Sequence, residues 1–452
     1  MKRFVPVGFI LSAVILQGCS LLSSSTNGEL VGVQSRPKYF EPDPYGMAFV
    51  ELGSITVGPS DQDVAWAQNV ESKTVSINAF WMDATEITNN EYRQFVYWVR
   101  DSIFRRTLAN AGVDGFLKEG DAYEELPEDL RPLNWATRID TKKNEDQKEA
   151  LEEMFLPVHE RFYGRKEVDT RKLLFEYLWV DMQQAAHTRN RYDYQKQQYS
   201  GFAFNAVGEK VDVKDRSAFI MKEKVPAYPD TLVWISDFSY SYNEPMTKMY
   251  FWHLAYDEYP VVGVNWKQAY AFCIWRSNLL NDALIRNKDV FVHLYRLPTE
   301  YEWEYAARGG LQNAKYPWGG PYTRNDQGCF LANFKPLRGN YADDGGVLTM
   351  RVASYAPNEM GIYDMAGNVA EWTASAYDES SYRVTHDLNP DYQYMARPDE
   401  PAVMKRKVVR GGSWKDVEYF LQVSTRIYEY QDTATSYIGF RCIRDYLGNS
   451  IK

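Results

Sequence analysis

Residues 410–442 read RGGSWKDVEYFLQVSTRIYEYQDTATSYIGFRC. The stretch opens with Gly-Gly-Ser-Trp and closes with Gly-Phe-Arg-Cys, and no cysteine lies between these two ends. Only four cysteines occur in the 452 residues of the chain. This span therefore offers no thiolate ligand to a soft metal ion.

The composition is that of an acidic globular protein. An apolar content of 45% over 452 residues can fill a sizeable core. The chain carries 61 acidic and 51 basic side chains, a formal net charge of -10, so we expect no nucleic-acid partner. The 34 Tyr, 22 Phe and 13 Trp residues indicate extended aromatic packing or interface surfaces.

The N-terminus has the features of a lipoprotein signal. Lys2 and Arg3 precede an apolar run at 4–16 that is too short to span a bilayer but fits the apolar region of a secretory signal. The run leads to Gly18 and Cys19, so residues 1–18 are predicted to be removed and Cys19 to be lipidated. An ordinary secreted protein with a chance cysteine is the alternative. Several acyl chains on Cys19 would give a firm membrane anchor.

The chain after Cys19 is predicted to form a flexible tether over residues 19–45, because it is rich in Ser, Gly and Pro and lacks apolar periodicity. Residues 46–446 are assigned to one domain. Alternating apolar and polar positions predict its opening strands in FVELGSITV and SKTVSINAFWMD, with a turn at Gly58 and Pro59 between them.

Long polar stretches predict a large, partly helical insertion at about 104–250. Its charge runs are interpreted as solvated faces. Leu174, Leu178 and Met182 recur at helical spacing and predict an amphipathic helix there.

Three helix starts share one local signature, a side-chain acceptor followed three residues later by Glu or Gln. They are Thr88 with Glu91, Asn265 with Gln268, and Thr299 with Glu302. The third helix is predicted to stop at Gly309.

Seven motifs of the chain resemble, in order, those of the formylglycine-generating (sulfatase-modifying) enzyme family. They are AFWMDATEITNNEYRQFV, PVVGVNWKQAYAFCIW, YRLPTEYEWEYAARGG, YPWGG, NEMGIYDMAGNVAEWT, RGGSW and GFRC. The resemblance covers nearly the whole chain outside the insertion. It implies an α+β fold of the formylglycine-generating-enzyme type, related to C-type lectins, with much irregular structure.

The resemblance also implies that the family's copper site is missing. Asp416, three residues after Ser413, stands where the family places its first reactive cysteine, and the second position falls within 418–421. The five histidines show no short ligand spacing of the kind an iron-binding branch would need. We therefore expect a pseudoenzyme with no catalytic residues and no copper.

Two cysteines sit where the family forms a structural disulfide, Cys273 in AFCIW and Cys442 in GFRC. An oxidising compartment would permit the bond, and two buried free thiols are the alternative. Cys329 has no evident partner.

Two oxygen-rich sets correspond to calcium sites of the family. The first consists of Asp364, Gly367, Val369 and Glu371, and the second of Asn333, Phe334, Asp344 and Gly346. Carboxylates and backbone carbonyls are the ligands that calcium prefers. Turns stabilised by Asx hydrogen bonds, without metal, are the alternative for both.

Within the family, the chain resembles the GldK/PorK-type lipoproteins of the type IX secretion and gliding machinery. The resemblance rests on the lipobox, FEPDPYGMAFVELGS, AFWMDATEITNNEYRQFVYWVRDSI and the place of the insertion. It implies a non-catalytic subunit of a periplasmic ring, attached to the outer membrane and self-associating beside a GldN/PorN-type partner near the GldL/GldM (PorL/PorM) motor proteins. The alternatives are the role of the sister lipoprotein GldJ, a formylglycine-generating-type oxidase, and a glycan-binding module.

Overall fold

The computed structural model describes residues 39–60, 63, 71–120, 123, 126–127, 131–141, 144–240, 246, 249–337, 339–343 and 345–448. Asp43–Gly448 form one compact unit, to which every element named below belongs. The predicted signal peptide, Cys19 and most of the predicted tether lie outside the described residues. Among the helices described, none combines the length and the apolar character that crossing a membrane requires.

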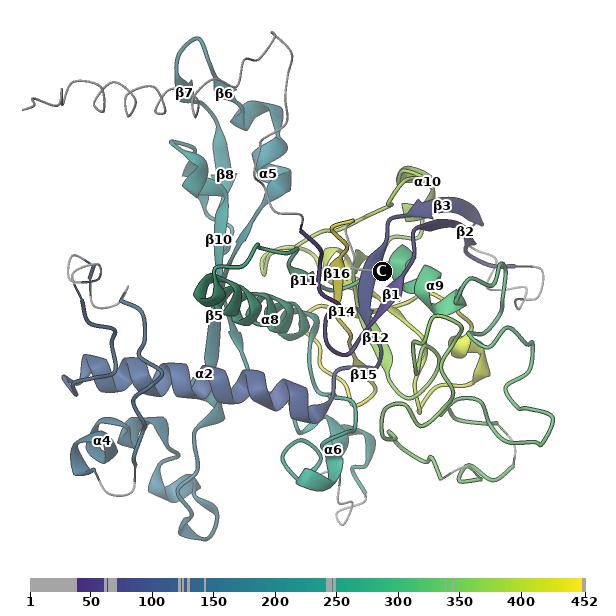
Figure 1. The fold of residues 1–452 in the computed structure, drawn as a ribbon, viewed down its shortest axis with the longest axis horizontal. Coiled ribbons are helices and arrows are strands. Elements are labelled where there is room, and N and C mark those ends of the chain that lie inside the picture. Colours follow the sequence, from purple (N-terminus) through teal and green to yellow (C-terminus); the bar gives the residue numbers. More distant parts are fainter. Residues whose placement is uncertain are drawn as a thin grey trace, which may run out of the picture. The chain divides into compact units, whose positions relative to one another are not determined.

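Two four-stranded sheets form the centre of this unit (Figure 1). The first is antiparallel, in the order β1 (Met47–Val50), β4 (Phe80–Asp83), β16 (Ile443–Asp445) and β11 (Tyr295–Arg296). The second has the order β14 (Ile427–Tyr430), β13 (Arg406–Arg410), β12 (Ala370–Ala376) and β15 (Ile438–Gly439), and only its β12–β15 pair is parallel. The opening strand β1 and the closing strand β16 therefore both pair with β4, one on each side, which ties the two ends of the unit together.

The strands predicted near the start of the domain are confirmed. A separate hairpin pairs β2 (Gly53–Val57) with β3 (Lys73–Ile77), and β1 and β4 pair on either side of it in sequence. Along β3 the residues Val75 and Ile77 are buried and their neighbours are not, as the alternating pattern predicts.

The three predicted helix starts are also confirmed. The helices are α2 (Asn89–Asn110), α8 (Trp266–Asn287) and α9 (Glu300–Arg308), and each begins with a complete capping box. The third helix ends at Gly309, which adopts a left-handed backbone with φ 60°, as glycine does at helix ends.

Helices α2 and α8 pack against each other through aromatic rings. Tyr92 of α2 stacks on Phe272 of α8 with ring centroids 5.6 Å apart, and Phe440 contacts both rings at 6.2 and 5.4 Å. Phe95 extends the cluster to Trp275 at 5.4 Å. Because each ring buries a large apolar area, this cluster forms the centre of the main core.

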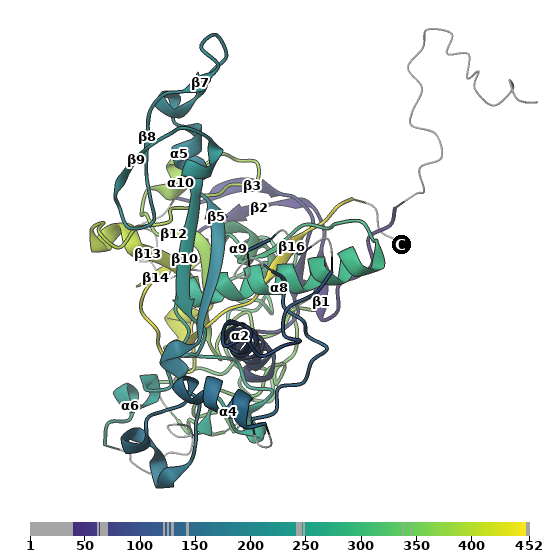
Figure 2. The same ribbon diagram turned by 90° about the vertical axis from the view of Figure 1, so that its left-hand side faces the viewer.

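The predicted insertion contains short elements around one long hairpin. In chain order they are α4 (Glu145–Ala150), β5 (Leu174–Val180), α5 (Met182–Ala186), β6 (Tyr192–Asp193), β7 (Gln198–Tyr199), β8 (Phe202–Phe204), β9 (Lys210–Asp212), β10 (Ile220–Pro226) and α6 (Val233–Asp237). Figures 1 and 2 both show β5 and β10 running crosswise to α8. A further short helix, α10 (Ser381–Val384), lies outside the insertion.

The amphipathic helix predicted over Leu174, Leu178 and Met182 is wrong. Leu174–Val180 form strand β5, and Met182 begins the separate helix α5. Phe175 and Tyr177 are buried while Leu174 and Leu178 are exposed, so the period is two residues. A run of aromatic and branched side chains favours a strand, and residues four apart share a face in a strand as well as in a helix.

The predicted disulfide pair comes together in the core. The Sγ atoms of Cys273 on α8 and Cys442 beside β16 lie 3.5 Å apart, and both side chains are buried. They are two thiols in the structure, and burial raises the pKa of Cys442 well above its ordinary value.

We expect Cys273 and Cys442 to be cross-linked in protein exported to an oxidising compartment. A map of tryptic peptides blocked with iodoacetamide without reduction would contain the linked pair, and reduction would lower the free energy of unfolding by about 3–5 kcal/mol because the bond closes a long loop. Replacing the exposed Cys329 with Ser is the matched control and should change neither result. Alkylation of both Cys273 and Cys442 without reduction would contradict the prediction.

Candidate functional site

The turn after β13 occupies the place where the resemblance puts the first reactive cysteine. Gly411 and Gly412 have φ values of 93° and 67°, and a Cβ on Gly412 would lie 2.8 Å from the backbone of Phe420. Ser413 is buried and its Oγ donates to Asp416 Oδ2 at 2.6 Å. Burial raises the pKa of Asp416, and the Ser413 hydroxyl opposes this rise. The two oxygen side chains at this place therefore bind each other.

The place of the second cysteine, residues 418–421, forms one turn of 3₁₀ helix over Glu418–Leu421. Leu421 is fully buried in it and contributes to an apolar cluster.

Aromatic residues of the insertion cover the Gly-Gly-Ser-Trp turn of residues 411–414. Trp414 stacks on Trp234 of α6 and on Phe238 directly after α6, with ring centroids 5.9 and 6.2 Å apart. Asp237 at the end of α6 pairs with Lys415 and accepts a hydrogen bond from Ser436. The insertion and the Gly-Gly-Ser-Trp turn thus form one packed unit.

A second polar group lies where β12 begins. Both carboxylate oxygens of Glu371 bind Arg441, with Nε at 2.8 Å and Nη2 at 2.6 Å, and the Trp303 indole donates to the same carboxylate at 2.8 Å. Glu371 and Arg441 are both buried. Three charge-assisted hydrogen bonds therefore satisfy this carboxylate without solvent.

Two more buried carboxyl groups lie close to this pair. Glu86 accepts hydrogen bonds from the Asn368 side chain at 2.8 Å and from the Val369 N–H at 3.2 Å. Asp364 accepts from the backbone N–H of Ala353 at 2.7 Å. The pKa of Glu86 lies well above its ordinary value and that of Asp364 is raised to about 6; burial is the main cause of both shifts, and the charge of Glu371 contributes to both. With all three carboxyl groups ionised, Arg441 would balance only one of their charges.

The first predicted calcium set spans a tight turn, which contains Asp364, Gly367 and Val369, and the start of β12, which contains Glu371. Asp364 and Gly367 both have left-handed backbones, with φ values of 56° and 82°. A hard cation bound here would offset the surplus negative charge of the buried carboxyl groups around Arg441. Glu371 would then have to share its oxygens between the cation and Arg441. Among the described residues, no three His, Cys, Asp or Glu side chains form a group that could hold a metal.

The second predicted set comes together only in part. Asp344 lies outside the described residues. Asn333 lies beside Gly346, because a Cβ on Gly346 would approach its Oδ1 to 2.8 Å, and Phe334 is buried next to it in sequence. The Asn333 carbonyl accepts from the Asn368 N–H at 2.8 Å. The two predicted sets are therefore adjacent in the fold.

A larger buried ion network, which the sequence pattern does not predict, surrounds α9. Arg410 contacts Glu304 at 3.0 Å, Glu300 at 3.3 Å and the Tyr382 hydroxyl at 2.8 Å, and Arg426 contacts Glu300 at 2.6 Å. All these side chains are buried or nearly so. The spacing of Glu300 and Glu304 is that of one helix face, but a charged helix face is usually solvated, so their burial does not follow from the sequence pattern.

In the absence of a bound cation, Asp364 should make stability depend on pH. The pKa of Asp364 in the folded state, about 6, lies above its value in the unfolded chain. Its stabilising contribution to the folded state is therefore complete below about pH 4 and is lost as pH rises through about 6. In chelator, Asp364→Asn should raise the free energy of unfolding by about 1–3 kcal/mol near pH 7.5 and change it little near pH 4. Urea denaturation at the two pH values measures this, with exposed Asp326→Asn as control. Equal effects at both pH values would contradict it.

We expect calcium to raise the melting temperature of the wild-type protein near pH 7.5, because a cation bound only by the folded state stabilises it. Asp364→Asn should show a smaller rise. The measurement is a calorimetric melt with calcium and with chelator. An unchanged wild-type midpoint would show that these residues do not hold the ion.

Comparisons with known proteins place the chain in a family. The model of the sulfatase-modifying factor enzyme 1-like domain matches residues 34–154 and 181–446. An inactive C-alpha-formylglycine-generating enzyme 2 of Bos taurus is 35% identical over 191 residues, 41% of this chain and 50% of that protein. The formylglycine-generating enzyme of Bos taurus is 25% identical over 437 residues, 95% of this chain and 83% of that enzyme.

Among solved structures, PvdO from Pseudomonas aeruginosa matches with a TM-score of 0.44 and 17% identity, covering 88% of this chain and 94% of that one. The 191-residue match to the inactive relative spans about half of that protein's length. The family model, in contrast, matches well over half of the present chain. The chain therefore belongs to the family of sulfatase-modifying factor enzyme 1-like domains and has the α+β fold of formylglycine-generating enzymes.

Proposed function

We propose that the protein is a non-catalytic structural lipoprotein of the type IX secretion and gliding machinery, of the GldK/PorK type. In this proposal Cys19 anchors it to the outer membrane, and its domain builds a periplasmic ring with further copies and a GldN/PorN-type partner. The observation that carries the assembly role is the exposed apolar surface of the insertion. The resemblance of the motifs and the lipobox supplies the identity of the machinery.

The chemistry of the Gly-Gly-Ser-Trp turn supports a non-catalytic role. Ser413 and Asp416 offer hard oxygen donors, which are poor ligands for copper(I), and they are bonded to each other. Trp414 is covered by the Trp234 ring of α6 and by the Phe238 ring directly after it. The family relatives include both a formylglycine-generating enzyme and a protein named as inactive, so family membership is compatible with either role.

The hairpin of residues 174–226, here called the arm, carries the apolar surface. Val180 of β5 lies opposite Ile220 of β10, and these side chains are 51% and 46% exposed. Met182 and Tyr194 beside them are 70% and 85% exposed. All four side chains line one cavity of about 630 Å³. Contiguous apolar exposure of this kind marks protein contact sites.

The outer edge of β5 adds backbone groups to this surface. The Asp181 N–H donates to the Phe219 carbonyl at 2.9 Å. In this register the backbone N–H and C=O groups of the odd-numbered residues of β5 bond to β10, and those of the even-numbered residues point away from β10. Within the part of the chain that is described, no other strand pairs with β5. An open edge of seven residues can pair with a strand of another protein.

We expect the double substitution Val180→Glu and Met182→Glu to abolish ring assembly while the domain stays folded, because two carboxylates in a buried apolar contact would be costly. The full-length protein would be isolated in mild detergent, sized by light scattering, and its bound proteins identified by mass spectrometry. Val384→Glu is the control, since Val384 is 66% exposed but lies outside the arm. Recovery of the wild type as a lone monomer would overturn the assembly role.

The purified protein should neither bind copper(I) stoichiometrically nor oxidise a cysteine-bearing peptide. Titration in an anaerobic chamber with a copper(I) chelator competitor, followed by mass analysis of the peptide in air, measures both. The Cys329→Ser variant should be used in parallel, because its exposed thiol could bind copper adventitiously. Stoichiometric copper together with an aldehyde product would support the oxidase alternative and contradict the proposal.

A further inference from the structure

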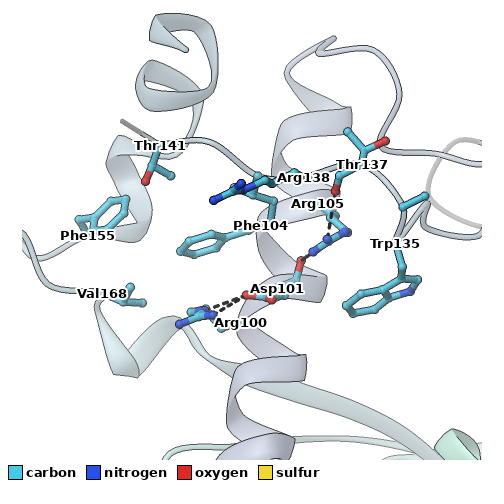
Figure 3. Close-up of a pocket in the computed structure, with 12 residues that line it drawn as sticks. Arg100, Asp101, Phe104, Arg105, Trp135, Thr137, Arg138, Thr141, Phe155 and Val168 are labelled. Atoms are coloured by element: carbon cyan, nitrogen blue, oxygen red, sulfur yellow. Dashed lines mark hydrogen bonds and ion pairs between the residues drawn. The ribbon is translucent and has the colours of Figure 1, made fainter. Parts of the chain in front are cut away.

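A cavity of about 560 Å³ lies in the insertion, between the second half of α2 and the segments around residues 135–141 and 155–168 (Figure 3). Its lining includes three guanidinium groups, those of Arg100, Arg105 and Arg138, and a single carboxylate, that of Asp101. Its size is in the range of sites that bind small molecules or parts of a peptide. The lining therefore carries a surplus of positive charge.

Arg105 holds the wall of the cavity in place. It is buried, and it donates to the backbone carbonyls of Asn134, Asp101 and Thr137 at 3.2, 3.3 and 3.2 Å. Its guanidinium also lies over the Trp135 ring at 4.6 Å. These contacts use three of its five N–H donors, so Arg105 fastens the 134–137 segment to α2.

The other two arginines differ in their partners. Arg100 is paired with Asp101 at 2.8 Å and lies over the Tyr97 ring. Arg138 is exposed and makes no hydrogen bond or ion pair with any residue the structure describes. Figure 3 shows its side chain reaching over Phe104 toward the middle of the cavity. Among the arginines of the described lining, Arg138 is therefore the one available to a ligand.

The opposite side of the cavity is apolar. Phe104 is buried on α2, Phe155 faces it with ring centroids 6.0 Å apart, and Val168 lies beside them. A ligand that fills the cavity must therefore combine a negative group for Arg138 with an apolar group for the two rings.

We propose that this cavity binds an acidic side chain of a peptide segment in which an apolar residue stands next to the acidic one. The planar fork of Arg138 matches a carboxylate in a two-point hydrogen bond, and Phe104 and Phe155 receive the apolar neighbour. A free inorganic anion would satisfy the charge but leave the aromatic wall in water. The inference goes beyond the assembly role, because the purified domain alone should bind such a peptide.

Isothermal titration of the full-length protein with the capped tripeptide Phe-Glu-Phe tests the proposal. The same peptide with Gln in place of Glu should bind at least about tenfold more weakly, since a charge-assisted pair is lost. Arg138→Gln should weaken binding of the Glu peptide by a similar factor, and Phe155→Leu should weaken it through the apolar side. Arg165→Gln, an exposed arginine of the same insertion outside the cavity, should leave binding unchanged.

Each contrary outcome overturns the proposal. These are no binding of the Glu peptide at millimolar concentration, equal affinity for the Gln peptide, or unchanged affinity in Arg138→Gln. Inorganic phosphate that binds as tightly as the Glu peptide would show an anion site without peptide recognition. Circular dichroism of each variant confirms that a loss of binding is not a loss of fold.

Discussion

The buried pair of Arg441 and Glu371 is the contact on which the rest of the domain depends. The Arg441 guanidinium also donates to the carbonyls of Asp83 at 3.0 Å and Tyr363 at 2.9 Å, so it joins the end of β4, the start of β12 and the segment between β15 and β16. Glu371 extends the link to Trp303 on α9. A buried ion pair contributes little net stability, but removing one partner costs about 3–5 kcal/mol because the other charge stays buried. The main effect of the pair is therefore to fix how these segments are placed relative to one another, and not to add net stability.

Local features of the fold could be predicted from the sequence, because their causes are local. A capping box needs only two side chains three residues apart, and all three were found where expected. Strand β5 was mistaken for a helix, since Leu174 and Leu178 fit both periods and only the burial of Phe175 and Tyr177 decides between them. The burial of Glu300 depends on Arg410 and Arg426, more than a hundred residues away in the chain.

In the candidate site, too, the features with local causes could be predicted from the sequence and those that depend on tertiary packing could not. The turn at Asp364 and the strand start at Glu371 belong to one short motif, and the absence of thiols from residues 411–441 can be read directly from the sequence. The presence of Glu86 beside that turn, and of Trp234 over Trp414, depends on tertiary packing between distant segments. The cavity beside Arg138 likewise arises only when three parts of the insertion meet.

Helix α2 has a mechanical consequence for the insertion. It is a single helix of 22 residues, about 33 Å long, without Gly or Pro, and the predicted start of the insertion near residue 104 falls within it. Its first turn is fixed to the core by Asn89, which donates to Tyr250 and Tyr256, and its last turns carry Arg105 and the wall of the cavity. The insertion cannot hinge at this junction without breaking the helix. A force applied to the insertion would therefore be transmitted along α2 to the core.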